Sequence, residues 1–409
     1  MNIREGVIWA YRLILNREPS DQEIGAQVAA FTDPPALRRN LRTSRQFATL
    51  FERAGEPYEP RLPIDWREGV LWAYRLLLRR EPSEEELRAN LVENDTINGL
   101  RLRLLTTREF EVGSPGGAPL LNFAIVNAFA PFPRSEPVAD GFRDVFGSIT
   151  RVHYLQDSYK HLAGYVYRSV PWEREGGLHG TSEWVGTLRS ILEAKGSFTV
   201  MELGAGWAPW LVGSQTIARQ RGITKIDLIG VEGSAEHYGF MVDNFRNNGL
   251  DPDAYHLHHA VAGAVDGVAS FPKLHVAQDD YGASAVFDDS ERPAAALRGD
   301  LEEIPSLSLK TLIGDRPRID LIHIDIQGHE EAVIAAGIDV LDARVRRLVI
   351  GTHSRTIEGH LFDLLHAHGW ICESEVPCVI WPTMDGGRYL AADGEQVWRN
   401  DRLDGSIAA

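Results

Sequence analysis

A short apolar run that ends at a glycine turn constrains this chain more than any other stretch. Residues 198–203 have the composition of a buried strand and carry one carboxylate, Glu202. Gly204 and Gly206 follow, and glycine permits both a tight turn and a close approach of a ligand to the main chain. Pro209 suits the first turn of a helix, where no N–H is needed. The stretch therefore predicts a strand, a ligand-binding turn and a helix over residues 210–220.

Two cofactors compete for a turn of this kind. The dinucleotide fingerprint Gly-x-Gly-x-x-Gly places a pyrophosphate on the helix N-terminus. Here Pro209 stands at the third glycine, and Glu202 would repel a pyrophosphate. A carboxylate suits the amino and sulfonium cations of S-adenosylmethionine instead, and Glu-x-Gly-x-Gly resembles the first motif of class I methyltransferases. A turn that binds nothing is the alternative. The cofactor contacts expected here are Glu202, Gly204, Ala205, Gly206 and Trp207.

The next two predicted strands extend the cofactor site. Residues 225–232 form a second apolar run that ends in Glu232, and a carboxylate at this place hydrogen-bonds ribose hydroxyls in Rossmann-like folds. Gly233 is assigned to the same site, and a helix cap is the alternative role for Glu232. After a helix over 235–247, residues 254–263 predict a third strand. Ala260 and Val261 near its end would contact the adenine through the backbone.

The fourth and fifth predicted strands supply candidate catalytic groups. Residues 319–331 combine an apolar strand with a polar tip that holds Asp325, Gln327, His329 and Glu330. The stretch resembles the Asp-x-x-x-Lys-Ile-Asp-Val-Glu-Gly-x-Glu hallmark of FkbM-type methyltransferases. The matching residues are Asp320, Ile324, Asp325, Gly328 and Glu330, whereas His323 and Gln327 replace the family's lysine and glutamate. The fifth strand, over 345–354, ends near His353, where this family commonly has a histidine.

The resemblance covers about residues 198–375 and implies a Rossmann-like class I methyltransferase fold with an N-terminal all-α repeat domain. It implies S-adenosylmethionine as cofactor and O-methylation of a sugar or glycan. Asp325 and His353 are the expected base or acceptor-orienting groups, with His179 and His329 as alternative bases. An NAD-dependent oxidoreductase and a non-catalytic binding module are the rival interpretations.

The N-terminal part of the chain contains an internal repeat. Residues 4–13, 17–20 and 43–47 return at 67–76, 80–83 and 106–110, always 63 positions later (67 − 4, 80 − 17, 106 − 43). Each copy predicts about three helices, with Ser20–Glu23 and Ser83–Glu86 as capping boxes. The copies resemble a small helical module of bacterial cell-surface-carbohydrate proteins. A packing or dimerising role is favoured over docking to a protein partner or glycan.

Domain boundaries follow glycine- and proline-rich stretches. We expect two repeats at about 4–53 and 67–112 within residues 1–113, separated by a linker at 54–63. A linker at 114–150 precedes a catalytic domain over 151–400. Its aromatic segment at 152–192 is either a lid over the cofactor or sheet packing. An irregular insertion at about 264–311 is expected to form part of the acceptor pocket.

Composition narrows the functional classes. The net charge of −16 disfavours a nucleic acid as partner, because binding phosphates needs a basic face. No apolar run is long enough for a membrane span and no signal-peptide pattern opens the chain, so a cytoplasmic protein is expected. The two cysteines are too few for a zinc site, and the histidines at 256, 258 and 259 suit a solvated strand face. No metal ligand is predicted.

Overall fold

The computed structural model describes residues 3–404 except 32, 43, 49, 51–57, 59, 61–62, 94–95, 108–109, 111–117, 134–135, 169, 171–177, 289, 291, 298 and 385–386. The chain divides into two compact units, Met1–Pro131 and Phe132–Ala409. The segment predicted as a linker at 114–150 contributes to both, because its apolar part forms helix α9 (Ala118–Val126) and its later part forms two short strands. Most of the linker predicted at 54–63 lies outside the described residues.

The first unit is all helical, and its helices recur at the offset of the sequence repeat. The first set is α1 (Ile3–Leu15), α2 (Asp21–Ala30), α3 (Pro34–Arg42) and α4 (Arg45–Ala48). The second is α5 (Trp66–Ala73) with the π-helical segment η2 (Tyr74–Leu78), then α6 (Glu84–Glu93) and α7 (Ile97–Leu105). Both predicted capping boxes are present, since Ser20 and Glu23 exchange hydrogen bonds, as do Ser83 and Glu86.

The two repeats pack through a reciprocal pair of contacts between tryptophan and glycine. A Cβ on Gly6 would lie 2.4 Å from the ring of Trp72, and one on Gly69 would lie 2.5 Å from the ring of Trp9. Both tryptophans are fully buried. These residues, which the repeat duplicates, therefore serve the core of the unit.

The second unit begins with small elements that lead into a large sheet. These are the hairpin of β1 (Gly141–Arg143) and β2 (Ile149–Arg151), the 3-10 helices η3 (Val152–Tyr154) and η4 (Asp157–Leu162), and helix α10 (Thr181–Leu192). Tyr154 and Leu155 pack with Trp207, so this aromatic segment belongs to a core cluster.

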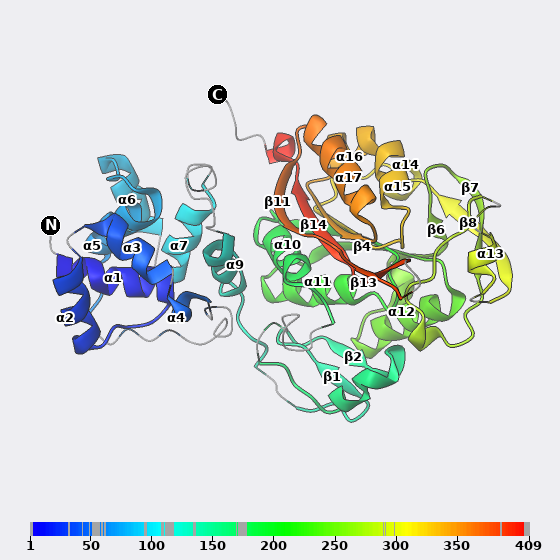
Figure 1. Cartoon of the computed structure of the whole chain (residues 1–409), viewed down its shortest axis with the longest axis horizontal. Coiled ribbons are helices and arrows are strands. Elements are labelled where there is room, and N and C mark those ends of the chain that lie inside the picture. The colour runs from blue at the N-terminus through cyan, green and yellow to red at the C-terminus, as the bar shows by residue number, and fades with distance from the viewer. Residues whose placement is uncertain are drawn as a thin grey trace. The chain divides into compact units, whose positions relative to one another are not determined.

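Seven strands in the described part of the chain form the central sheet, in the order β11-β14-β10-β9-β3-β4-β5 (Figure 1). Their bounds are Ser197–Leu203 (β3), Lys225–Glu232 (β4), His256–His259 (β5), Leu321–Ile324 (β9), Arg347–Thr352 (β10), Ile371–Val376 (β11) and Gly394–Arg399 (β14). The five adjacent strands β10, β9, β3, β4 and β5 are parallel to one another. The order of strands along the chain reverses between β3 and β9. This is a Rossmann-like sheet, and its switch point is the expected place for a ligand.

The sheet is mixed rather than entirely parallel. β14 runs antiparallel to both β10 and β11. The connection from β11 to β14 carries the hairpin β12 (Val379–Pro382) and β13 (Arg388–Ala392) in place of a crossover helix, and a helical crossover is the usual route to a parallel neighbour.

Helices cover both faces of the sheet (Figure 1). α10, α11 (Pro209–Gln220) and α12 (Ala235–Asn247) lie on one face. On the other lie α14 (Leu309–Ile313), α15 (Glu330–Ala336), α16 (Ile338–Arg344) and α17 (Arg355–Ala367), whose apolar side chains share one core with the strands. Within the described residues, every helix is too short or too polar to cross a bilayer.

The segment expected to be an irregular insertion has its own sheet, so that expectation was wrong. β7 (Gly267–Pro272) pairs antiparallel with β8 (Leu301–Leu307), and β6 (Val261–Ala262) pairs parallel with β8. The predicted third strand is thus split between two sheets. The remaining short helices are η6 (Pro252–Ala254), η7 (Ala277–Asp279), α13 (Arg292–Ala295) and η8 (Asp401–Asp404).

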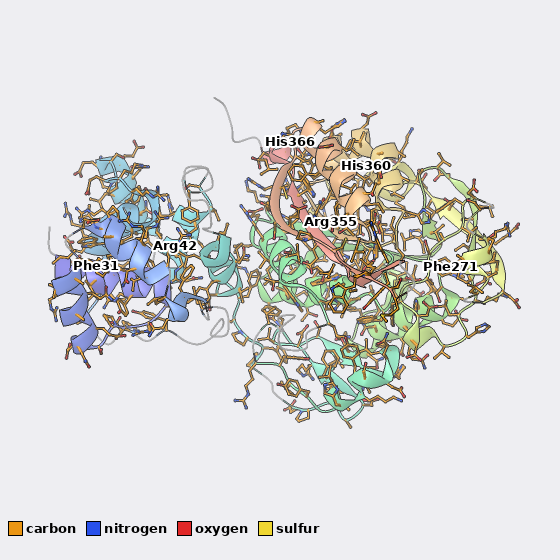
Figure 2. All side chains as sticks on the ribbon, in the orientation of Figure 1. Phe31, Arg42, Phe271, Arg355, His360 and His366 are labelled. Carbon is orange, nitrogen blue, oxygen red and sulfur yellow. The ribbon has the colours of Figure 1, made fainter. Side chains whose placement is uncertain are left out.

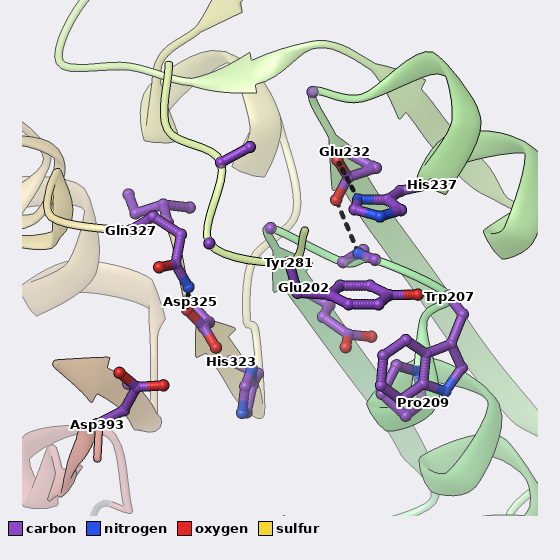
Figure 3. Close-up of a pocket in the computed structure, with 18 of the residues that line it drawn as sticks. Glu202, Trp207, Pro209, Glu232, His237, Tyr281, His323, Asp325, Gln327 and Asp393 are labelled. Carbon is purple, nitrogen blue, oxygen red and sulfur yellow. Dashed lines mark hydrogen bonds and ion pairs between the residues drawn. The ribbon is translucent and has the colours of Figure 1, made fainter. Parts of the chain in front are cut away.

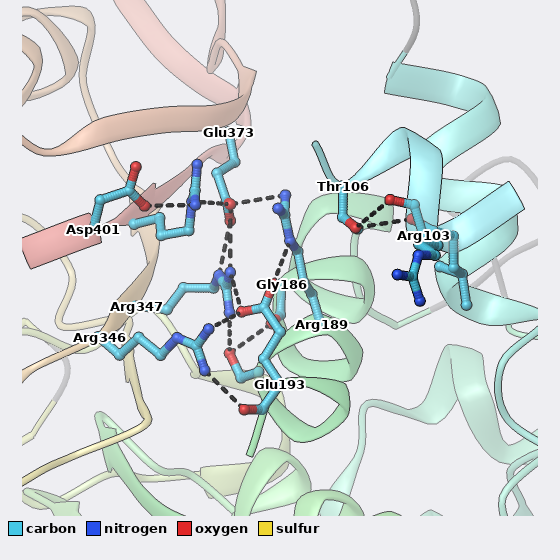
Figure 4. Close-up of polar contacts among 12 residues, drawn as sticks. Arg103, Thr106, Gly186, Arg189, Glu193, Arg346, Arg347, Glu373 and Asp401 are labelled. Carbon is cyan, nitrogen blue, oxygen red and sulfur yellow. Dashed lines mark hydrogen bonds and ion pairs between the residues drawn. The ribbon is translucent and has the colours of Figure 1, made fainter. Parts of the chain in front are cut away.

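A buried network of charged side chains joins α10 to the sheet at strands β10 and β11 (Figure 4). Arg347 of β10 is fully buried and pairs with Glu373 of β11 at 2.7 Å and with Glu193, just after α10, at 2.9 Å. Arg189 of α10 contacts the same two carboxylates. Because each charge has partners on another element, the network fixes how helix and strands meet.

Candidate active site

A cavity of about 740 Å³ opens where the parallel strands end, at the switch between β3 and β9 (Figure 3). Its volume falls within the usual range for small-molecule sites. All nine residues predicted to bind the cofactor line it: Glu202, Gly204, Ala205, Gly206, Trp207, Glu232, Gly233, Ala260 and Val261. Asp325 lines the same cavity, whereas His353 lies behind it, against Asp325.

The turn after β3 needs its glycines. Gly204 has a φ of +73°, and a Cβ there would lie 1.8 Å from the carbonyl oxygen of Asp325. Gly206 has a φ of +55°, and Pro209 is the first residue of α11. The predicted strand, turn and helix are therefore present, with the main chain of the turn exposed to the cavity.

Glu232 is held beside this turn. Its Oε2 accepts the N–H of Gly206 at 2.7 Å and its Oε1 accepts the N–H of Ser234 at 2.7 Å. The second bond ties Glu232 to Ser234, which is the N-cap residue of α12, so Glu232 supports the start of the helix but is not its cap. The two bonds fix the carboxylate in the cavity wall, 5 % exposed, as a charged acceptor for hydroxyl groups.

The carboxyl group of Glu202 lies at the N-terminus of α11. Its Oε2 accepts the N–H of Leu211 at 3.0 Å, so the helix end that would hold a pyrophosphate is already bound to a carboxylate. This contact argues against a dinucleotide. Burial raises the pKa of Glu202 to about 8, so the group is mostly protonated at neutral pH. No sequence motif indicates this neutral state.

Aromatic rings from three segments close one end of the cavity (Figure 3). Tyr281 stacks on His237 with ring centroids 4.2 Å apart, and Trp207 meets Tyr281 edge-on at 5.0 Å. The Tyr281 hydroxyl donates to the carbonyl oxygen of Tyr154 at 2.6 Å. The segment after β7 thus reaches the cavity through Tyr281, which lies next to the turn and Glu232.

The opposite end brings Asp325 and His353 together, as their places at the ends of adjacent strands predict. Nε2 of His353 lies 3.3 Å from Oδ1 of Asp325, and Nδ1 lies 2.9 Å from Oε1 of Glu330. Burial lowers the pKa of His353, but its contacts with the two carboxylates outweigh burial and raise the pKa to about 10. A doubly protonated ring cannot accept a proton, so Asp325 is the stronger candidate for a base. Burial raises the pKa of Asp325, yet His353 outweighs it and holds the pKa below its usual value.

The sequence did not single out several lining residues. Asp393 and Glu395 come from the turn between β13 and β14 and from β14 itself, and Glu183 comes from α10. Glu183 lies 2.8 Å from Nε2 of His323, whose ring stacks on Trp210. A Gly next to Asp393 marks a turn in the sequence, but only the antiparallel return of β14 brings that turn to the cavity.

The two alternative bases have different surroundings. His179 lines the cavity with its ring centroid 6.0 Å from that of Trp207, and burial lowers its pKa. His329 also lines the cavity, with Nε2 at 3.0 Å from the carbonyl oxygen of Ala285. That contact needs a proton on Nε2, so this nitrogen cannot serve as the base.

Comparison with known proteins identifies the class. The chain is 35 % identical over 224 residues, 54 % of its length and 79 % of the other, to a protein of Jannaschia sp. (strain CCS1) named "Putative methyltransferase". The chain therefore belongs to this methyltransferase family. No family model matches the sequence. Methyltransferases with a Rossmann-like sheet use S-adenosylmethionine, which is the cofactor predicted from the sequence.

Solved structures with a similar fold include two precorrin-6Y C5,15-methyltransferases. The Geobacter metallireducens protein matches with 14 % identity and a TM-score of 0.31, over 55 % of this chain and 89 % of that one. The C-terminal domain of the Rhodobacter capsulatus protein matches with 15 % identity and a TM-score of 0.29, over 56 % and 94 %.

Proposed function

We propose that this chain transfers a methyl group from S-adenosylmethionine to a hydroxyl oxygen of a sugar or glycan, as the FkbM resemblance implies. The carrying observation is the charge of the cavity. Among the described residues that line it are seven carboxyl groups and no lysine or arginine. The carboxyl groups belong to Glu183, Glu202, Glu232, Asp280, Asp325, Asp393 and Glu395, and burial keeps Glu202 mostly protonated at neutral pH.

Such a wall suits a neutral polyol. Carboxylates accept hydrogen bonds from hydroxyl groups, and a phosphate or nucleotide sugar would meet repulsion with no compensating cation. The bound cofactor supplies an electrophilic methyl group on its sulfonium. Transfer of this methyl group to an acceptor oxygen would require a residue of the chain to take the hydroxyl proton.

The protein's own part is positioning and proton transfer. Glu232 and the turn at Gly204–Gly206 hold the cofactor end of the cavity, and Asp325 lies where strand β9 ends at the other. Asp325 is the candidate to accept or orient the hydroxyl, and positioning supplies most of the rate. Under this proposal, the acceptor binds between Asp325 and the cofactor end of the cavity.

A methylation assay with a matched acceptor pair tests the proposal. The chain is incubated with S-adenosylmethionine that carries a labelled methyl group and either a neutral glycan or the same glycan bearing a phosphate. We expect a base-stable methyl ether on the neutral glycan and little product on the phosphorylated one. Preference for the phosphorylated acceptor, or a base-labile methyl ester, would contradict the proposal.

A further inference from the structure

The imidazole of His353, at the end of the cavity that contains Asp325, has a carboxylate close to each of its ring nitrogens. His353 places Nδ1 2.9 Å from Glu330, and its Nε2 lies 3.3 Å from Oδ1 of Asp325 and 3.9 Å from Oδ1 of Asp393. Asp325, Glu330 and His353 present donor atoms within 4.8 Å of one another. The two sides of the ring, however, are not equivalent.

Both carboxylate oxygens of Glu330 already accept hydrogen bonds. It is fully buried, and its Oε1 accepts the N–H groups of Ile326 and Gly328, each at 3.1 Å, besides facing Nδ1 of His353. Its second oxygen also receives the N–H of Gly328, at 3.2 Å. Glu330 therefore fixes a proton on Nδ1 and orients the ring. A carboxylate behind the outer nitrogen is the usual support for a metal-binding histidine.

The other nitrogen lacks a hydrogen-bond partner. The His353 side chain is 9 % exposed, and Nε2 is buried without a hydrogen bond of good geometry although two carboxylates face it. A nitrogen lone pair and two carboxylates repel one another unless a positive charge lies between them. In the metal-free chain a proton on Nε2 supplies this charge, and a divalent metal ion that displaces the proton could take its place.

We propose that Nε2 of His353 and the carboxylates of Asp325 and Asp393 form a binding site for a divalent cation, with Glu330 as its outer support. Asp325 and Asp393 both line the cavity and lie at the end of the close-up away from Trp207 (Figure 3). The site therefore opens to the acceptor, and a cation with three protein ligands keeps free positions for substrate.

The ligand set indicates the kind of metal. Two carboxylates suit hard ions such as Mg²⁺ and Mn²⁺, whereas an imidazole favours transition metals. Mn²⁺ satisfies both preferences. If the proposed function holds, a cation here would attract the acceptor hydroxyl and make its proton easier to remove. This role rests on the proposed function, but the existence of the site does not.

Binding of Mn²⁺ to the full chain, without cofactor or acceptor, tests the site. Electron paramagnetic resonance should count one bound ion per chain, and pulsed measurements should detect coupling to an imidazole nitrogen. Asp325→Asn, Asp393→Asn and His353→Gln should each weaken binding roughly 10-fold or more, as even outer-shell changes do. The nitrogen coupling should vanish in His353→Gln.

The matched control is His360→Gln. His360 lies on α17 (Figure 2), exposed, and pairs with Glu331 at 2.9 Å, so it repeats the imidazole–carboxylate pair away from the cavity. This variant should bind Mn²⁺ as the unaltered chain does. Asp393 is largely exposed, so Asp393→Asn should fold even if the buried changes do not. Absence of binding at millimolar Mn²⁺, binding without nitrogen coupling, or binding indifferent to Asp393→Asn in the folded variant would overturn the proposal. Because no acceptor is present, these outcomes are independent of whether the chain methylates a glycan.

Discussion

The α-carbon of Gly204 packs against the carbonyl oxygen of Asp325, so the cofactor turn and the end of β9 touch through the backbone. A Cβ at residue 204 would lie 1.8 Å from that oxygen. The contact links the two ends of the cavity, because a movement of the turn would also displace the backbone of Asp325, which directly follows β9.

Gly204→Ala should therefore both destabilise the fold and weaken cofactor binding. Its positive φ alone costs roughly 1–3 kcal/mol for another residue, and the clash adds to this cost. Gly213→Ala is the control, because this glycine of α11 has nothing within 4 Å of its missing Cβ and should gain about 0.5–1 kcal/mol from helix propensity. Denaturant unfolding measures the stability of both variants. Equal stabilities for the two variants would show that the turn tolerates a side chain.

Glu232→Ala should weaken S-adenosylmethionine binding by roughly 1–3 kcal/mol, because buried ribose hydroxyls would lose a charged acceptor. The loss also releases the N–H of Gly206, which loosens the turn. Titration calorimetry gives the affinity. Glu236→Ala is the control, since this exposed carboxylate lies one turn on in α12 and outside the cavity lining. Unchanged affinity in Glu232→Ala would remove the ribose assignment.

Asp325→Asn should reduce turnover more than cofactor binding. If Asp325 takes the hydroxyl proton, its loss costs roughly 10²–10⁴-fold in rate. If it only orients the acceptor, the Michaelis constant rises and kcat changes less. The carboxamide keeps the shape, so cofactor affinity measured by calorimetry should stay the same. Glu331→Gln, a half-exposed neighbour on α15, serves as control. Wild-type kinetics in Asp325→Asn would exclude both roles.

Local patterns predicted well the strands and helices at the end of the cavity that is assigned to the cofactor. The predicted strand at 225–232 and helix at 235–247 have the bounds of β4 and α12. Each is a continuous apolar or amphipathic run between residues that end strands or helices. Whether it forms a strand or a helix therefore depends mainly on residues close in sequence. Carboxyl-end residues of parallel strands also share one edge, which is why the nine cofactor residues could be grouped without a structure.

The parts that the sequence could not predict depend on distant pairing. β6 and β7 exist because β8 lies between them, and β8 begins almost 40 residues after β6. Asp393 reaches the cavity because β14 returns antiparallel along β10. The raised pKa of Glu202 likewise results from burial by the packed helix and strands, which no motif encodes.

Arg347→Ala should destabilise the second unit by up to about 3–5 kcal/mol, because it removes a fully buried arginine that bridges Glu193 and Glu373 and leaves Arg189 to balance both carboxylates. Lys160→Ala is the matched control, since Lys160 and Asp157 form an exposed pair worth at most about 1 kcal/mol. Chemical denaturation compares the variants. A loss in Arg347→Ala no larger than in Lys160→Ala would show that the remaining arginines carry the network.

The buried carboxyl group of Glu202 should make stability depend on pH. Its pKa rises from 4.5 to about 8 in the folded chain, so the native state holds the proton more tightly than the unfolded state. The contribution is complete below pH 4.5 and is lost as the pH rises towards 8, at up to about 1 kcal/mol per pH unit. Glu202→Gln cannot ionise, so the excess of its free energy of unfolding over that of the unaltered chain should grow across this range. Free energies of unfolding measured between these two pH values provide the test. A constant difference between the unaltered chain and Glu202→Gln would mean that Glu202 is ionised in the folded protein and faces the cavity as a charge.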